Sequence, residues 1–379
     1  MKIEDFKSGV YQQQFQYKSF LPELINQEWT WDDPRMNVLL EKATKALAEL
    51  NAYTLIVPDV DLFIHMHILK EANTSSRIEG TQTEMDDVIL DETEVLPEKK
   101  DDWSEVQNYV KAINTAIEEL ETLPLSIRLL NQTHAVLMDG VRGKHKTPGK
   151  IRKSQNWIGG SNLADAAYIP PHQDEVAELL SDLEKFWHND MIHVPHLIRI
   201  ALSHYQFETI HPFLDGNGRV GRLLITLYLV SNGLLTKPSL YLSAHLEKHR
   251  SSYYDALSRV RESHDLGHWC RFFLQAVIET AESGVSTFQN IMELRNDLDQ
   301  RIVTLGRRAE NARKLVMYLY QRPFTTVNST MELLDLKYVP ASKLIAALVD
   351  LGILNEVTGY KRNRIFMFEQ YLDVFRNES

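Results

Sequence analysis

The chain has 379 residues, of which 44% are hydrophobic and 25% charged, the balance of a folded globular protein with room for two or three domains. Its formal net charge of -11 disfavours general attraction to nucleic acid or anionic membranes, although it allows a local basic patch. The single cysteine, Cys270, excludes an intrachain disulfide and fits a reducing compartment. Apolar segments of signal-peptide or membrane-spanning length are lacking, so we expect a cytoplasmic protein without a membrane partner.

Helical patterns dominate the first third of the chain. Apolar residues recur there at three- and four-residue spacing, which predicts amphipathic helices. One of them begins at an aspartate able to cap a helix and stops at Gly80, the usual terminating residue. The helices are expected at 36–54, 61–80, 103–123 and 125–140, with a short helix and a solvated acidic connection over 83–102.

Residues 140–171 interrupt this helical pattern. The segment is rich in glycine and proline, and short apolar arms lie on either side of Gly159 and Gly160. Such a composition predicts a β-hairpin or an extended flap rather than a helix. Helices are expected to resume at 174–190, 196–210, 221–235, 246–262 and 266–305.

The last seventy or so residues change character. Three short helices are predicted at 310–323, 328–336 and 340–354, followed by a hairpin around Gly359. Three helices and a two-stranded wing are the pattern of a winged helix. The basic residues of the wing suit contacts to DNA phosphates; they are Lys361, Arg362 and Arg364. The presumed recognition helix carries only Lys343 as a cation, so protein docking or dimerisation is an equal alternative to DNA binding.

Residues 211–222 read HPFLDGNGRVGR and stand between two apolar segments. The apolar run after Arg222 predicts a buried helix, which places Gly216, Asn217 and Gly218 at its N-terminus. Backbone N–H groups at a helix start lack intrahelical partners, and the helix dipole adds partial positive charge. Glycine lets a phosphate approach the backbone closely. The stretch is therefore a candidate anion site.

The side chains of the same stretch add the rest of a phosphate-transfer site. Arg219 and Arg222 are three residues apart and share a helix face, where guanidinium groups suit phosphate oxygens. Asp215 offers oxygen to Mg²⁺, and His211 can act as a base near neutral pH. Each of these features alone more often has a purely structural role, but their combination in twelve residues is specific for a functional site. The stretch matches neither the P-loop nor the Rossmann pattern.

The motif HPFLDGNGRVGR resembles, without departure, the H-[PF]-F-x-[DE]-G-N-G-R-x-x-R signature of the Fic (Fido) domain. The resemblance covers roughly residues 60–280, including the helices beside the motif and the glycine-rich flap. It implies a mainly α protein, namely a Fic-type helical bundle with a β-hairpin flap, here joined to the winged-helix module. It also implies transfer of AMP from ATP to a Ser, Thr or Tyr hydroxyl of a protein, with Mg²⁺ as cofactor, release of pyrophosphate and self-modification.

The resemblance divides the chain into four parts. They are an N-terminal helical region (1–110) with an inhibitory helix at about 61–79, a Fic catalytic domain (111–285), a linker helix (286–307) and the winged-helix-like domain (308–379).

It also assigns roles to individual residues. His211 would deprotonate the target hydroxyl, and Asp215 would hold Mg²⁺. The remaining nucleotide contacts are Gly216, Asn217 and Gly218 around the phosphates, with Asn217 on the α-phosphate, Arg219 on the β-phosphate and Arg222 on the γ-phosphate. Tyr253 and Tyr254 would wall the adenine, or else pack a helix into the core. The flap residues that would dock the target by strand addition are Trp157, Ile158, Gly159, Gly160, Tyr168 and Ile169.

A second stretch, SSRIEG at 75–80, resembles the inhibitory motif [ST]-x-x-x-E-[GN] of the same family. Ser75 and Glu79 are four residues apart and share a helix face. The resemblance implies that Glu79 pairs with Arg222 and blocks productive binding of ATP. Without it, the stretch reads as a polar helix end closed by Gly80.

Three other functions stay open at this point. The same fold could remove AMP with Glu79 positioning water, or transfer another phosphate-linked group. The chain could also be a nucleotide-sensing DNA-binding regulator, although a sensor would not need His211. A homodimer is compatible with each of them.

Overall fold

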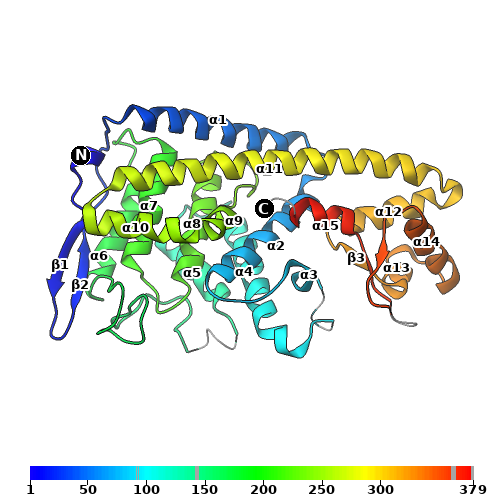
Figure 1. The fold of residues 1–379 in the computed structure, drawn as a ribbon, viewed down its shortest axis with the longest axis horizontal. Coiled ribbons are helices and arrows are strands. Elements are labelled where there is room, and N and C mark those ends of the chain that lie inside the picture. The colour runs from blue at the N-terminus through cyan, green and yellow to red at the C-terminus, as the bar shows by residue number, and fades with distance from the viewer. Residues whose placement is uncertain (91, 93, 141–144, 360–363, 377–379) are drawn as a thin grey trace.

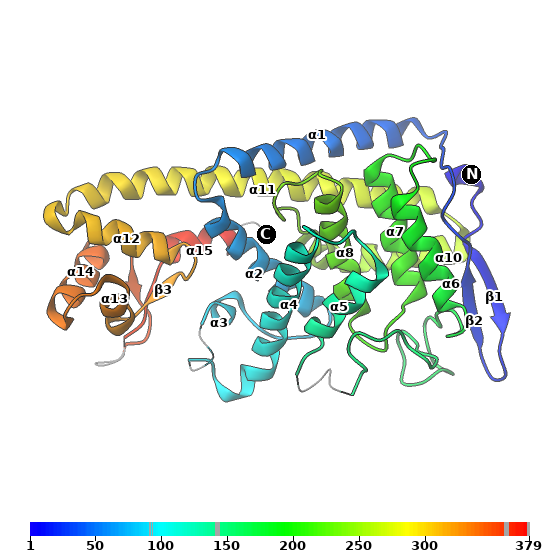
Figure 2. The ribbon, with the colours of Figure 1, turned by 180° about the vertical axis from the view of Figure 1, so that it is seen from behind.

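The computed structural model describes residues 1–90, 92, 94–140, 145–359 and 364–376. The fold is mainly helical, as the sequence predicts, and elongated (Figure 1). Helices α1 (Pro34–Ile56) and α11 (Leu266–Val303) lie side by side along the long axis, which Figure 2 shows from behind. The described chain has no helix that combines the length and apolar character needed to cross a bilayer.

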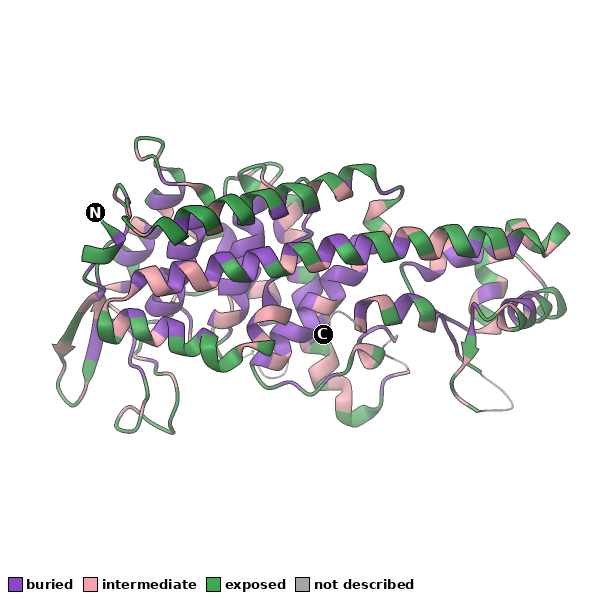
Figure 3. Cartoon of the chain, turned by 45° about the horizontal axis from the view of Figure 1, so that its top comes forward, coloured by how far each residue is buried: buried purple, intermediate pink, exposed green. Residues whose placement is uncertain are grey.

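The helices between α1 and α11 in the chain form a bundle packed against these two helices. Its other helices are α2 (Val60–Ile78), α3 (Met85–Val88), α4 (Lys100–Glu119), α5 (Ile127–Leu137), α6 (Val176–His188), α7 (His196–Ile210), α8 (Asn217–Ser231), α9 (Ser243–Lys248) and α10 (Arg250–Ser263), with 3-10 turns at Ile3–Asp5, Pro97–Lys99 and Gly306–Arg308. Helices α7 and α8 are buried almost throughout, which explains their nearly continuous apolar sequences (Figure 3).

Two details of the predicted helices are corrected. The segment 246–262 is not one helix, because the chain breaks between α9 and α10 at His249, whose φ of -107° and ψ of 34° lie outside the helical region. Helix α8 begins at Asn217, which confirms the predicted N-terminus at 216–218 and extends the expected segment 221–235 by four residues at its start.

The predicted flap is present in reduced form. Its two arms pair antiparallel at a single position, where Ile158 and Tyr168 exchange backbone hydrogen bonds of 2.9 and 3.1 Å. The sequence analysis missed a hairpin at the N-terminus, formed by β1 (Gly9–Gln13) and β2 (Lys18–Pro22).

The C-terminal part contains the predicted three helices and strand pair. Its elements are α12 (Ala309–Leu319), β3 (Phe324–Thr325), α13 (Val327–Leu334), α14 (Tyr338–Asp350), β4 (Asn355–Glu356), β5 (Phe366–Met367) and α15 (Glu369–Arg376), with the strands antiparallel in the order β3-β5-β4. The winged-helix assignment stays a prediction. Of the predicted wing cations, Lys361 and Arg362 lie outside the described residues.

The C-terminal part is packed against this bundle rather than tethered to it. Tyr320, directly after α12, and Tyr371 of the unpredicted helix α15 place their rings 5.1 and 6.3 Å from Phe63 of α2. The predicted boundaries at 110 and 285 fall within α4 and α11. Two of the predicted boundaries thus cut through continuous helices, and the division into four parts stays a prediction.

Candidate active site at the α7–α8 corner

His211 ends α7 in an unusual backbone conformation. Its φ of 51° and ψ of 61° are left-handed, which is uncommon for a residue with a side chain and turns the chain sharply towards α8. Its Nδ1–H donates to the carbonyl of Glu208, at 3.4 Å, so Nε2 carries the lone pair. Burial lowers the pKa of His211 to about 4, although the Glu208 carbonyl and the charge of Glu79 oppose this. The imidazole is therefore a neutral proton acceptor at pH 7.

His134 of α5 supports the loop that follows. Its ring stacks on Phe213 with centroids 3.8 Å apart, and its Nδ1 accepts a hydrogen bond from the Gly149 backbone. The proton is thus on Nε2, which donates to the carbonyl of Asp215 at 3.0 Å. Burial lowers the pKa of His134 to about 4, so this tautomer persists at neutral pH.

Asn217, the first residue of α8, has both ends of its side-chain amide engaged. The Phe213 N–H donates to Oδ1 and Nδ2 donates to the Phe213 carbonyl, each at 2.8 Å. The side chain is buried and closes the loop, and the second N–H of Nδ2 has no protein partner among these bonds. The contact between Asn217 and the α-phosphate therefore stays a prediction.

The two arginines of the motif lie within α8 and are both buried. Arg222 donates from Nε to Ser75 Oγ at 2.8 Å and from Nη2 to the Ser75 carbonyl at 2.9 Å. Arg219 donates from Nη1 to Glu105 of α4 at 3.3 Å. Both guanidinium groups therefore have protein partners around the helix start.

The predicted partner of Arg222 is in place. Glu79, at the C-terminal end of α2, accepts from Arg222 Nη2 at 2.7 Å, although 143 positions separate the two residues. Burial opposes ionisation of Glu79, but the charge and the hydrogen bond of Arg222 outweigh it, so the pKa of Glu79 is lowered. The carboxylate is charged at neutral pH.

This carboxylate lies directly over the start of α8. A Cβ added at Gly218 would stand 2.3 Å from Glu79 Oε1 and 3.0 Å from Arg222 Nη1. Only glycine permits so close an approach. Beside it, Asp215 and Arg219 line a pocket of about 230 Å³, below the ~300 Å³ at the lower end of ligand sites.

The flap lies on the other side of His211. Tyr168 and Ile169 are buried, and Tyr168 donates its hydroxyl proton to the Thr209 carbonyl at 2.8 Å. The N–H of Phe20 in β2 donates to the Ile169 carbonyl at 3.0 Å, so the N-terminal hairpin occupies the outer edge of the second arm. The first arm, with Trp157 at 40% exposure, is the accessible edge.

The two predicted adenine-wall tyrosines differ in their surroundings. Tyr253 is 1% exposed, and its hydroxyl donates to His204 Nε2 at 2.9 Å, while His204 Nδ1 contacts the Gly221 carbonyl. The ring of Tyr254 is 5.1 Å from that of Tyr253, and 41% of Tyr254 is exposed. Tyr253 is therefore a core residue behind α8, and Tyr254 is the one with surface to offer a ligand.

The sequence analysis missed two residues that hold His211 in place. Arg152 Nε and Asn156 Nδ2 both donate to the His211 carbonyl, at 2.9 and 3.0 Å. Arg152 also donates from Nη2 to the Pro171 carbonyl at 2.6 Å, and its side chain is buried. The two side chains donate to backbone carbonyls, most of them in distant segments, so no local sequence signal could have identified them.

Comparison with known proteins finds family models and solved structures that are similar to this chain. Residues 37–118 match the Fic/DOC family N-terminal model, and residues 124–229 match the Fic/DOC family model. The fold is similar to that of a Fic family protein from Desulfovibrio desulfuricans G20, with a TM-score of 0.57, 20% identity, and coverage of 90% of this chain and 98% of that chain. It is also similar to a Fic domain containing signaling protein from Bacteroides thetaiotaomicron VPI-5482, with a TM-score of 0.54, 15% identity, and coverage of 65% and 97%.

Two curated relatives are named protein adenylyltransferase Fic. The one from Drosophila erecta is 28% identical over 177 residues, or 46% of this chain and 32% of its own length. The one from Culex quinquefasciatus is 31% identical over 135 residues, or 35% and 24%. The matches thus span a third or less of these relatives. Taken with the motif and the fold, they show that the chain is a member of the Fic/DOC family.

Proposed function

We propose that the protein is an autoinhibited protein adenylyltransferase that transfers AMP from ATP to a Ser, Thr or Tyr hydroxyl of a protein. The observation that carries the proposal is the α7–α8 corner, where a neutral imidazole with a free lone pair adjoins a helix start and two buried arginines. The names of the curated relatives support the same activity.

In the proposed reaction, the target hydroxyl gives its proton to Nε2 of His211 while its oxygen attacks the α-phosphorus of ATP. A new P–O bond forms, the bond to the β-phosphate oxygen breaks, and pyrophosphate leaves. The histidine needs no prior deprotonation, since burial keeps its pKa at about 4. The hydrogen bonds from Arg152 and Asn156 to its carbonyl would hold the imidazole at the end of α7.

The triphosphate would lie along the start of α8. There the backbone N–H groups of Asn217 and Gly218 and the side chains of Arg219 and Arg222 offer donors and positive charge. Asp215 is the residue suited to Mg²⁺, because its carboxylate is exposed and only Oδ1 accepts from the Gly216 backbone, at 2.7 Å. When bound, Mg²⁺ would neutralise charge on the phosphates.

The target segment would add as a strand to the first arm of the flap, since β2 already occupies the outer edge of the second arm. Backbone pairing fixes the register of such a segment with little dependence on its sequence. It would hold a hydroxyl side chain near His211. Self-modification would follow if a segment of the chain itself reached this edge.

Glu79 would act as the brake on this reaction. Its carboxylate approaches Gly218 at the place where phosphate would bind, and it occupies Nη2 of Arg222. A triphosphate and a carboxylate repel each other, so a productive pose would require Glu79 to leave. Because 37% of its side chain is exposed, its removal should cost less stability than the ~3–5 kcal/mol of a fully buried pair. Arg222 would keep its bonds to Ser75.

Incubation of the purified chain with ATP labelled on the α- or the γ-phosphate, in wild-type and Glu79→Gly protein, tests the proposal. Label from the α position alone, appearing on protein, is the expected result. Label from the γ position would indicate phosphoryl transfer instead. Release of AMP from a pre-modified protein by wild type, but not by Glu79→Gly, would favour the deAMPylation alternative. Nucleotide binding without transfer in either protein would favour the sensor alternative.

A further inference from the structure

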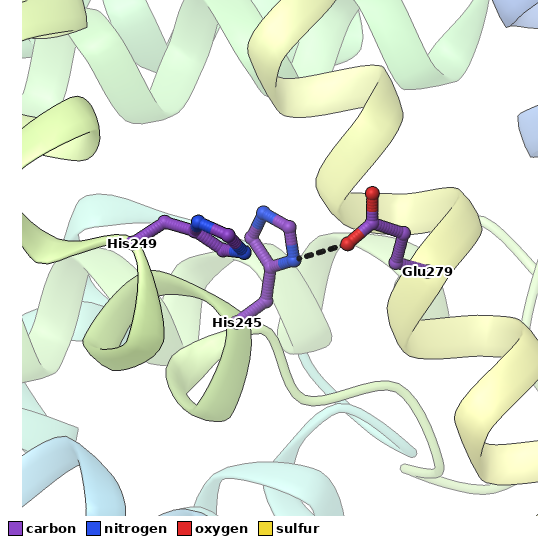
Figure 4. A group of neighbouring side chains, drawn as sticks. All are labelled: His245, His249 and Glu279. Carbon is purple, nitrogen blue, oxygen red and sulfur yellow. Dashed lines mark ion pairs between the residues drawn. The ribbon is translucent and has the colours of Figure 1, made fainter. Parts of the chain in front are cut away.

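Two histidines and a glutamate meet at the junction of α9, α10 and α11, outside the site described above. His245 lies in α9 and His249 at the break between α9 and α10, four residues later, while Glu279 projects from α11. One ligand atom from each of the three lies within 4.8 Å of the others. Figure 4 shows the two imidazoles beside each other, with the Glu279 carboxylate pointing at His245.

The distances between the three side chains can be compared with those between the ligands of a metal ion. His245 Nδ1 and Glu279 Oε2 are 3.2 Å apart, and the two imidazole centroids are 4.5 Å apart. Tetrahedral Zn²⁺ with bonds of about 2.0–2.1 Å places its ligand atoms roughly 3.3 Å from one another. The first pair already has that separation, and rotation of the His249 side chain would close the rest.

The charges on one side of the group also suit a cation, whereas Lys248 lies on the side facing α2. The cleft beside it is lined by Asp255 and Glu262, and Arg259 is the one Lys or Arg among its described lining residues.

We propose that His245, His249 and Glu279 bind a Zn²⁺ ion, with the remaining position open to water from the cleft. Two imidazoles and one carboxylate form a recurrent three-ligand set for zinc, and the set would cross-link α11 to the corner between α9 and α10. A simple ion pair between His245 and Glu279 would give no role to His249 and no affinity for metal.

The position of the ion would matter for the helix that carries Glu79. Helix α9 is bonded to α2 twice, by the Ser243 hydroxyl donating to Glu71 at 2.5 Å and by an ion pair of 2.7 Å between Glu247 and Arg77. By holding α9 against α11, zinc would therefore also restrict the position of α2, which is bonded to α9. This inference does not depend on the adenylyl transfer proposed above.

The test uses the full chain with any affinity tag removed. Protein stripped with EDTA and dialysed against a small excess of ZnCl₂ is expected to retain about one Zn²⁺ per chain by elemental analysis. Its melting temperature should rise with the concentration of Zn²⁺. His249→Ala and Glu279→Gln should each weaken zinc binding at least about tenfold and abolish the rise.

His172→Ala is the matched control, since the His172 Nδ1–Asp174 Oδ2 pair at 3.3 Å resembles the His245–Glu279 pair but belongs to no three-ligand group among the described residues. It should bind zinc as wild type does. Circular dichroism checks the folding of each variant, and Glu279→Gln alters a side chain that is 46% exposed. Absence of stoichiometric zinc in wild type, or equal zinc in wild type and folded Glu279→Gln, would overturn the proposal.

Discussion

The end of α2 and the middle of α4 each place a carboxylate on an arginine of α8, but in different ways. Glu79 follows the last residue of α2 and contacts Arg222 at 2.7 Å. Glu105 lies within α4, next to the buried residue Val106, and contacts Arg219 at 3.3 Å. A residue at a helix end can move with few losses of backbone hydrogen bonds, whereas one inside a helix cannot.

The surroundings of the two carboxylates also indicate that Glu79 can move more easily than Glu105. Glu79 precedes Gly80, which has a φ of 107° and no atom within 4 Å of where a Cβ would stand. Glu79 also lies over Gly218, whereas the side chain of Glu105 is 21% exposed and contacts Arg219. We therefore expect Glu79 to be a displaceable competitor of phosphate, and Glu105 to be a fixed partner that orients its arginine.

This contrast has meaning only if transfer takes place at His211, so the largest effect is expected there. His211→Ala, made in the Glu79→Gly background, should reduce transfer of α-label by at least about 100-fold, because the general base is lost. Nucleotide affinity should change little. Transfer and nucleotide binding are measured on the same protein, with His172→Ala as a surface control. Retained transfer would contradict the role of His211 as base.

The next effect separates the two carboxylates directly. Glu79→Gly should raise transfer, including self-modification, by at least about tenfold, which corresponds to a barrier lower by only ~1.4 kcal/mol. The reason is that Arg222 and the space over Gly218 become available to ATP. Initial rates at equal ATP and Mg²⁺ measure the change. If variant and wild type label protein equally, the brake assignment is wrong.

A third carboxylate, Glu208, also lies near Arg222, but unlike Glu79 and Glu105 it is buried, in α7. Burial raises its pKa to about 7, against the opposing charge of Arg222. A raised folded-state pKa gives stability that is complete below the unfolded value near 4.5 and is lost as pH rises through about 7.

The matching prediction concerns Glu208→Gln, which removes this titration. Relative to wild type, the variant should gain about 1 kcal/mol in the free energy of unfolding between pH 6 and pH 8. Denaturant titrations of both proteins at the two pH values measure the difference. A difference independent of pH would show that Glu208 is not protonated in the folded protein at pH 6.

The smallest effect is expected at α4. Glu105→Gln keeps the shape of the side chain and leaves Glu79 on Arg222, so transfer should stay within about twofold of wild type, a change of less than ~0.5 kcal/mol. The same assay as for Glu79→Gly measures it. An increase comparable to that of Glu79→Gly would mean that both carboxylates are brakes, and the contrast between helix end and helix interior would fail.

Much of the helical architecture was predictable because its elements bury apolar faces with regular spacing. The predicted segment 196–210 coincides with α7, and 36–54 and 61–80 differ from α1 and α2 by two residues or fewer at each end. The break at His249 was missed because neither glycine nor proline marks it in the sequence. The hairpin of β1 and β2 was also missed, as its outer strand buries none of its residues completely and has little apolar alternation.

The amino-acid sequence by itself determined that residues 211–222 form a helix start with a base, a carboxylate and two arginines, because this depends on spacing within one short segment. Only the tertiary structure decided which partner each group has. It directs the side chain of Asn217 to the loop, Arg152 and Asn156 to the His211 carbonyl, and Glu105 to Arg219. Except for the contact of Asn217 with Phe213, these are contacts between distant segments. Most involve backbone carbonyls, which every residue possesses and which sequence therefore does not distinguish.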